Sequence, residues 1–192
     1  MAVSLLFFSN LARAEVIHFH AELSGAAEAV PNASPGTGWA DVYFDNVAQT
    51  MQVVVSFSGL LAPTTASHIH AATTMPNTGT AGVATQVPNF AGFPLGVTAG
   101  TYDHVFDLTM ASSFNPAFVT ANGGTLATAS AALETALLAE KAYLNIHSSQ
   151  FAPGEIRGFL HRVPDTSSTL ILLSAALGGI ACFVRARKLA TV

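Results

Sequence analysis

The sequence predicts an all-β domain, an antiparallel Greek-key-like barrel or sandwich that carries one short helix. Three observations support this fold class. Apolar and polar residues alternate with period two in seven short segments, as they do in half-buried strands. Pro, Gly and Asn gather between these segments, where they mark turns and loops. One later segment, near residues 125–140, instead repeats its apolar residues at helical spacing.

The predicted strands occupy much of residues 16–161. They are the segments 16–23, 38–44, 51–57, 65–72, 102–108, 141–147 and 155–161. The second and third strands are separated by Asp45-Asn46, a typical turn pair, and the longer loops span residues 31–38, 75–82 and 88–100. Many short strands with turn signals between them favour an antiparallel barrel or sandwich.

The helix near residues 125–140 has a recognisable start. Thr125 follows Asn122-Gly123-Gly124 and can cap a helix. The apolar side chains that recur at helical spacing behind it are Leu126, Ala129, Leu133 and Leu137. We therefore expect a short helix that lies across the barrel or covers one of its ends, with this stripe packed into the core.

Length and charge narrow the function classes. The chain has 192 residues, enough for one ordinary domain. Between residues 15 and 163 stand ten acidic residues and three basic ones, which gives this part a charge near −7, against −4 for the whole chain. Such an acidic domain lacks the basic surface that nucleic-acid binding requires, so that class is excluded. The sole cysteine, Cys182, lies in the apolar tail, which excludes a disulfide and a Cys-based metal site in the domain.

Both ends of the chain carry export patterns. Residues 1–14 are predicted to be a signal peptide, because the apolar run 2–8 is followed by the small-x-small motif Ala12-Arg13-Ala14. No basic residue precedes the run, which indicates either that the true start lies upstream or that the leader is degenerate. A buried first strand is the alternative interpretation of this segment. At the other end, residues 168–184 are free of charge and long enough for a transmembrane helix, which takes ~17–25 residues. The basic residues at 185–188 would keep that end cytoplasmic and the β domain outside.

A short motif, Val163-Pro164-Asp165, opens the segment 163–169 just before this helix. The order of motif, apolar helix and basic end resembles the bacterial PEP-CTERM class of sorting signals, in particular its VPDSG-like variants, although Ser167 stands where the variant commonly has Gly. The resemblance implies recognition by an exosortase that cleaves near the motif. It predicts a membrane-anchored precursor that ends at the cell surface or outside the cell; a plain C-terminal anchor predicts the same topology.

Histidines are the residues most suited to chemistry in this domain. His68-Ile69-His70 lies on a predicted strand, so both imidazoles share one face and Ile69 points to the core. His147 ends another strand, on the face opposite Leu144 and Ile146. Imidazole suits copper and zinc, so these three histidines are a candidate metal site, with polar strand residues bonded to loops as the alternative.

Other histidines are weaker candidates. His104 and His161 are possible extra ligands, although each also fits a surface or capping role. His18-Phe19-His20 also alternates, and a solvated strand face is the main interpretation of it, with a weak surface metal site as the alternative.

Five motifs in this order resemble the CHRD domain, named after chordin and common in exported bacterial proteins. They are Leu23-Ser24-Gly25 with Glu28-Ala29-Val30-Pro31, His68-Ile69-His70, Asn115-Pro116-Ala117-Phe118-Val119-Thr120, Ala142-Tyr143-Leu144-Asn145-Ile146-His147 and Gly154-Glu155-Ile156-Arg157-Gly158. The resemblance covers residues 17–161. It departs from the family at Ala152-Pro153-Gly154, where a Pro-Gly-Gly run is usual.

A second resemblance is to copper-zinc superoxide dismutase, which also has an H-x-H strand, a later single histidine and a late Arg. It implies copper ligands at His68, His70 and His147 and an anion-guiding role for Arg157. A plain strand pairing of Arg157 with Glu155 is the alternative for that residue. No Asp-bearing zinc loop follows His70, so a site with both metals is not expected.

The sequence thus predicts a signal peptide at 1–14, a β domain at 15–162 and a sorting tail at 163–192. The first functional hypothesis is an exported, non-enzymatic module that binds copper, or else zinc. The second is a copper-dependent redox enzyme of superoxide dismutase-like type. The third is a metal-free structural or matrix protein with a partner in the cell envelope.

Overall fold

The computed structural model describes residues 16–164. The chain separates into two compact units, Met1–Arg162 and Val163–Val192. The predicted signal peptide, the transmembrane helix at 168–184, the basic end at 185–188 and Asp165 lie outside the described residues. Val163 and Pro164 of the sorting motif are described and belong to no helix or strand. Within residues 16–164, no helix is both long and apolar enough to cross a bilayer.

Eight strands build the described part of the domain, as the alternation predicts. They are β1 (Val16–Ser24), β2 (Thr37–Asp45), β3 (Thr50–Ser58), β4 (Thr64–His70), β5 (Gly100–Asp107), β6 (Tyr143–Ser148), β7 (Ile156–Phe159) and β8 (His161–Arg162). The one long strand predicted at 155–161 is divided in two at Leu160. The Leu160 N–H donates to the carbonyl of Ala142, and the following β8 pairs with β1 rather than with β6.

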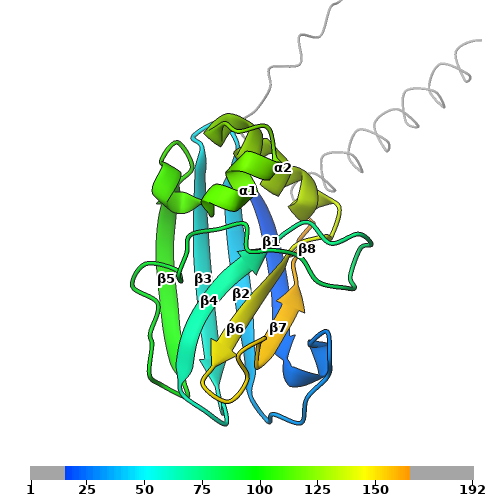
Figure 1. Cartoon of the computed structure of the whole chain (residues 1–192), viewed down its shortest axis with the longest axis vertical. Helices are drawn as coiled ribbons and strands as arrows, with labels where there is room; N and C mark the ends of the chain where they lie inside the picture. The colour runs from blue at the N-terminus through cyan, green and yellow to red at the C-terminus, as the bar shows by residue number, and fades with distance from the viewer. Residues whose placement is uncertain (1–15, 165–192) are drawn as a thin grey trace, which may run out of the picture. The chain divides into compact units, whose positions relative to one another are not determined.

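The strands form one antiparallel sheet in the order β4-β6-β7-β1-β2-β3-β5, with β8 also paired to β1. The sheet curls on itself, so that β4, β6 and β7 pass in front of β2 and β3 in Figure 1. The loop that leads into β5 runs along the edge strand β4, where Thr64 donates to Val97 and accepts from Gly96. The predicted barrel-like fold is therefore confirmed as a curled sheet, and residues 16–164 do not form a two-sheet sandwich.

The inside of the curl is the apolar core. Alternate side chains of the long strands are fully buried there, as the period of two requires. The largest of these side chains are Phe19, Phe44, Met51, Ile69, Leu144, Ile146 and Ile156. Each fully buried side chain of this size stabilises the fold by about 1.5–3 kcal/mol.

Two α-helices gather at one end of the curl (Figure 1). The predicted helix is α2 (Leu126–Leu138), and Thr125 caps it: its hydroxyl accepts from the Thr128 N–H. Leu133 and Leu137 of the predicted stripe are fully buried in the core. The sequence analysis did not predict α1 (Pro116–Ala121), which Asn115 caps. Two short 3-10 helices, η1 (Gly25–Ala27) and η2 (Ala111–Ser113), complete the fold.

The outer face of β4, β6 and β7 is covered by loops rather than left to solvent. Side chains on this face alternate with the core residues, and the register pairs His68 with Asn145, His70 with Tyr143, and Asn145 with Arg157. All five of these side chains are buried, with exposed fractions of 2–9%. A buried polar layer thus lies between the sheet and its covering loops, and it holds the candidate site.

Candidate metal centre

Three histidines from two neighbouring strands meet on this outer face. His68 and His70 come from β4, and His147 comes from β6, where it pairs with Ala66. Ile69 between the first two is fully buried in the core, which turns both imidazoles outward. The register of β4 and β6 therefore places the three imidazoles on the same face of the sheet.

The three rings lie close together. Their centroids are 5.3 Å apart for His68 and His147, and 5.8 Å apart for the other two pairs. One potential ligand nitrogen from each residue lies within 4.8 Å of those of the other two. Among the described residues, this is the group of His, Cys, Asp and Glu side chains arranged to hold a metal ion.

One nitrogen of each ring is buried and has no hydrogen-bond partner: Nδ1 of His68, Nε2 of His70 and Nε2 of His147. Buried polar atoms are nearly always paired, because leaving one unpaired costs about 1–3 kcal/mol. Three such nitrogens in one group make these histidines candidate metal ligands.

The other nitrogen of each ring contacts a backbone carbonyl. The distances are 2.6 Å from His68 Nε2 to Pro88, 2.9 Å from His70 Nδ1 to Ala81, and 3.0 Å from His147 Nδ1 to Ala152. A carbonyl can only accept, so each of these ring nitrogens carries the proton. The unpaired nitrogen of each ring therefore presents a lone pair, and the carbonyls fix the ring orientations as outer partners of metal ligands do.

Burial favours the neutral form of all three imidazoles. Burial lowers the pKa of His68, His70 and His147, although the carbonyl bonds partly oppose this effect. For His70 the pKa falls to about 4, with nearby positive charge as a further cause. Neutral imidazole is the form that binds copper and zinc, so burial favours the form that a metal requires.

Aromatic rings complete the walls of the site. The ring of Tyr143 stacks on His70 at 4.9 Å, nearly parallel, and Phe90 lies 6.5 Å from His68. The Arg157 guanidinium lies 4.7 Å from the centre of the Tyr143 ring. The three histidines thus lie among buried rings, where electrostatic interactions are stronger than in water.

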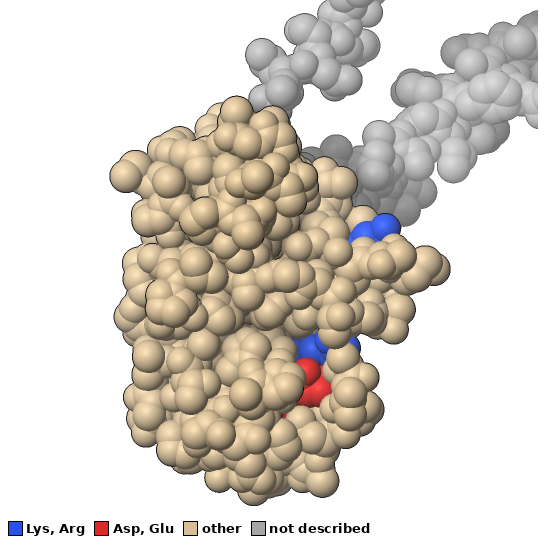
Figure 2. Space-filling model, in the orientation of Figure 1, with Lys and Arg blue, Asp and Glu red and all other residues tan. Residues whose placement is uncertain are grey.

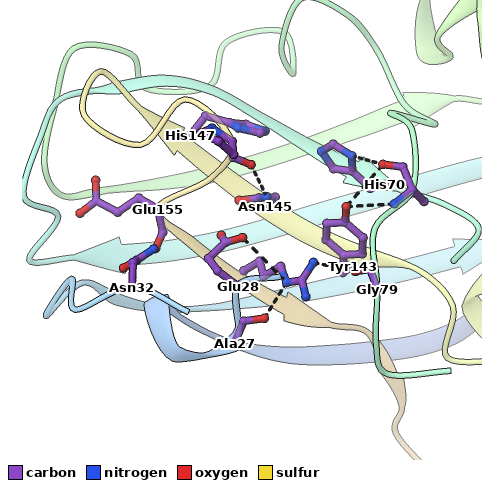
Figure 3. Close-up of polar contacts among 12 residues, drawn as sticks. Ala27, Glu28, Asn32, His70, Gly79, Tyr143, Asn145, His147 and Glu155 are labelled. Atoms are coloured by element: carbon purple, nitrogen blue, oxygen red, sulfur yellow. Dashed lines mark hydrogen bonds and ion pairs between the residues drawn. The ribbon is translucent and has the colours of Figure 1, made fainter. Parts of the chain in front are cut away.

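Arg157 hydrogen-bonds the loops over β7. It is only 4% exposed; its Nε donates to the carbonyl of Ala27 at 2.6 Å, and its Nη1 donates to that of Gly79 at 2.9 Å (Figure 3). Its acidic neighbour is Glu28, 3.9 Å away, and not Glu155. These contacts support a role in holding the covering loops, and the anion-guiding role remains a prediction.

A pocket of about 460 Å³ adjoins this layer, and sequence reasoning missed it. Glu28, Tyr143, Asn145 and Arg157 are among its lining residues. Figure 2 shows acidic and basic atoms side by side in a hollow of a face that otherwise carries almost no charge. A Cβ on Gly154 would collide with the Asn145 amide and the Glu28 carboxyl, so glycine is required there.

Glu28 is a buried acid. It is 8% exposed, and its Oε1 has no partner. Burial raises the pKa of Glu28 to about 7, although Arg157 works in the opposite direction. The only sequence signal for this residue is its place in the Glu28-Ala29-Val30-Pro31 motif.

The remaining histidines lie elsewhere. His104 packs against Phe106, with ring centroids 4.6 Å apart, and His161 pairs with Glu140 at 3.3 Å. His18 and His20 contact Asp41 on the outer face of β1 and β2. The structure does not bring any of these four residues to the three-histidine group.

The fold and the site together define a mostly β domain in which three histidines of β4 and β6 meet beneath covering loops. The family comparison gives its affiliation: the CHRD domain matches residues 19–160, and the chain belongs to the CHRD domain family. A search of curated proteins and a search of solved structures gave no match.

Proposed function

We propose that this protein is an exported CHRD-domain module that binds copper through His68, His70 and His147. The observation that carries the proposal is the group of three buried, unpartnered ring nitrogens, each on a ring held from behind by a carbonyl. A metal ion would satisfy all three lone pairs at once. The donor set is made of imidazoles alone, which suits copper or zinc and does not suit magnesium or calcium.

A binding role fits the geometry better than a redox enzyme does. The likeness to copper-zinc superoxide dismutase in the order of His68, His70, His147 and Arg157 supports copper as the metal. In an enzyme of that kind, however, the late Arg needs free donors beside an open metal position. Here two donor nitrogens of Arg157 bond backbone carbonyls, and the ligand nitrogens are closed off from water.

Export and sorting are part of the same proposal. The support is the sequence alone: the leader at 1–14, the motif Val163-Pro164-Asp165, the apolar segment 168–184 and the basic end 185–188. An exosortase-type enzyme is the proposed partner of the tail. The copper site would then act at the cell surface or outside the cell, where an envelope or matrix partner could also bind.

The test is the metal content of the purified full-length protein after separate loading with Cu(I), Cu(II) and Zn(II) and desalting. We expect near-stoichiometric copper in the wild type and none in the triple variant His68→Ala, His70→Ala, His147→Ala. The matched control is the double variant His18→Ala, His20→Ala, which removes the other H-x-H pair and should keep its copper. A folded wild type that retains no metal would overturn the proposal and favour a metal-free structural protein.

A further inference from the structure

The three ligand nitrogens have no open side in the structure. Nδ1 of His68 and Nε2 of His70 and His147 are each buried so deeply that water does not reach them. A zinc ion held by three protein ligands normally completes its coordination with a water molecule in an open position. Cu(II) likewise favours four or more ligands in a tetragonal arrangement. A closed site of three imidazoles therefore leaves either divalent ion short of a ligand.

The charge around the site also acts against a divalent ion. The three ligands are neutral and no carboxylate belongs to the group. A buried cation lies in the same layer: the Arg157 guanidinium is 4.7 Å from the centre of the Tyr143 ring, and that ring stacks on His70 at 4.9 Å. Glu28 stands 3.9 Å from that guanidinium, and so faces Arg157 rather than the metal ligands. The cost of burying an ion rises with the square of its charge, so this site accepts a monovalent ion far more readily.

The rings are also held in place before any metal arrives. Each is anchored to a backbone carbonyl of a covering loop: Pro88 and Ala81 in the loop after β4, and Ala152 in the loop after β6. Tyr143 stacks flat on His70 and limits its rotation further. Such anchoring resists the rearrangement that a divalent ion would need in order to gain a fourth ligand.

We propose that the three-histidine site selects Cu(I) over Cu(II) and Zn(II). This inference rests on the proposed copper-binding function and sharpens it. Cu(I) has a filled d shell, is soft, and is satisfied by three ligands without water. Bound there, it is shielded from oxidants that must touch the metal, so the protein stores or carries Cu(I) and does not cycle it.

The experiment is a competition on the full-length protein. Cu(I), supplied as its acetonitrile complex without oxygen, competes with bicinchoninate, and Zn(II) competes with a chromogenic chelator under the same buffer. We expect Cu(I) to bind at least about 100-fold more tightly than Zn(II), a difference of roughly 2.7 kcal/mol. Cu(II) loading should give no copper spectrum that depends on His68, His70 and His147 by electron paramagnetic resonance. His147→Ala should abolish tight Cu(I) binding, and His18→Ala should leave it unchanged.

A second variant tests the charge argument directly. Asn145 lies opposite His68 in the register, so Asn145→Asp places a carboxylate beside the ligands without a change in size. In a variant shown to be folded by circular dichroism, the preference for Cu(I) over Zn(II) should shrink by at least about tenfold. An unchanged preference would contradict the charge argument.

The outcomes separate the two proposals. Tight Cu(I) binding that needs the three histidines supports both. Cu(II) or Zn(II) bound as tightly as Cu(I) through the same histidines overturns the selectivity and leaves a metal-binding function in place. No metal of any kind in the folded protein overturns both.

Discussion

The same H-x-H pattern occurs twice in this domain with different outcomes. In β1, His18 and His20 stand on an open strand face, with side chains 28% and 39% exposed. Their ring nitrogens contact one carboxylate oxygen of Asp41, at 2.7 and 2.9 Å. In β4, His68 and His70 lie under covering loops, and each keeps one nitrogen without a partner.

The neighbouring strand decides the difference. His20 pairs in register with Asp41 of β2, so an acid is present to occupy the imidazoles. His70 pairs with Tyr143 of β6, and His147 of the same strand supplies a third imidazole. Carbonyls rather than carboxylates bind the outer nitrogens there. A pair of histidines on a strand therefore becomes a candidate metal site only when its cross-strand neighbours leave the nitrogens free and loops exclude water.

The largest expected effect comes from replacing Arg157, which hydrogen-bonds the loops over β7. Arg157→Met leaves the carbonyls of Ala27 and Gly79 and the Glu28 carboxyl without their buried cation. Breaking a buried charged contact in this way should lower the free energy of unfolding by about 3–5 kcal/mol, measured by urea denaturation. The double variant Arg157→Met, Glu28→Gln should recover part of this loss. Arg162→Met, at an exposed position, should change stability by less than about 1 kcal/mol, and an equal loss there would contradict the buried role of Arg157.

Single ligand changes sharpen the comparison next. His70→Ala removes one of three ligands and should weaken copper binding by at least about 100-fold, because even outer partners of a metal ligand are worth 10–100-fold. His20→Ala, the matching position of the exposed pair, should leave the affinity within about threefold of the wild type. Both are measured by competition with a chelator. Equal losses of copper affinity in the two variants would contradict the assignment of the metal to the buried histidines.

The buried acid beside the site predicts a pH dependence. Because the pKa of Glu28 is raised from 4.5 to about 7, the folded state holds this proton more tightly than the unfolded chain does. Its contribution to stability is therefore complete below about pH 4.5 and is lost as the pH rises through 7. Denaturation of wild type and Glu28→Gln at pH 5 and pH 8 should show the wild type losing about 1–3 kcal/mol more. Glu22→Gln, at an exposed site, should follow the wild type.

The smallest effect concerns the exposed pair. Burial lowers the pKa of His20, but hydrogen bonds to Asp41 and Glu22 act in the opposite direction, and the pKa is raised overall. Asp41→Asn should therefore lower that pKa, as seen by NMR titration of the ring protons. The free energy of unfolding should change by less than about 1 kcal/mol, as for other exposed ion pairs. A larger loss would show that this pair stabilises the fold more than its exposure implies.

Much of the fold was predictable because local pattern and burial agree. Alternation found every long strand, and Thr125 marked the start of α2. The order of strands in the sheet depends on long-range pairing, which no local pattern encodes. The short helix α1 was missed although Asn115-Pro116 offers a cap and a first-turn proline, because six residues are too few to show a helical period.

The site was predictable in part for a similar reason. Period two places His68 and His70 on one face, and the late strand adds His147. The carbonyls of Pro88, Ala81 and Ala152 belong to loops, whose paths the sequence does not reveal. The burial of Glu28 and the backbone bonds of Arg157 depend on the same loops.

The central claim is that a metal binds at the buried histidines and not at the exposed ones. A crystal of the copper-loaded protein, with an anomalous difference map measured at the copper edge, tests it most directly. The account predicts one strong peak at about 2.0 Å from Nδ1 of His68 and from Nε2 of His70 and His147. A peak at His18, His20 and Asp41 instead, or an empty map in a crystal grown with Cu(I) in the absence of oxygen, would contradict it.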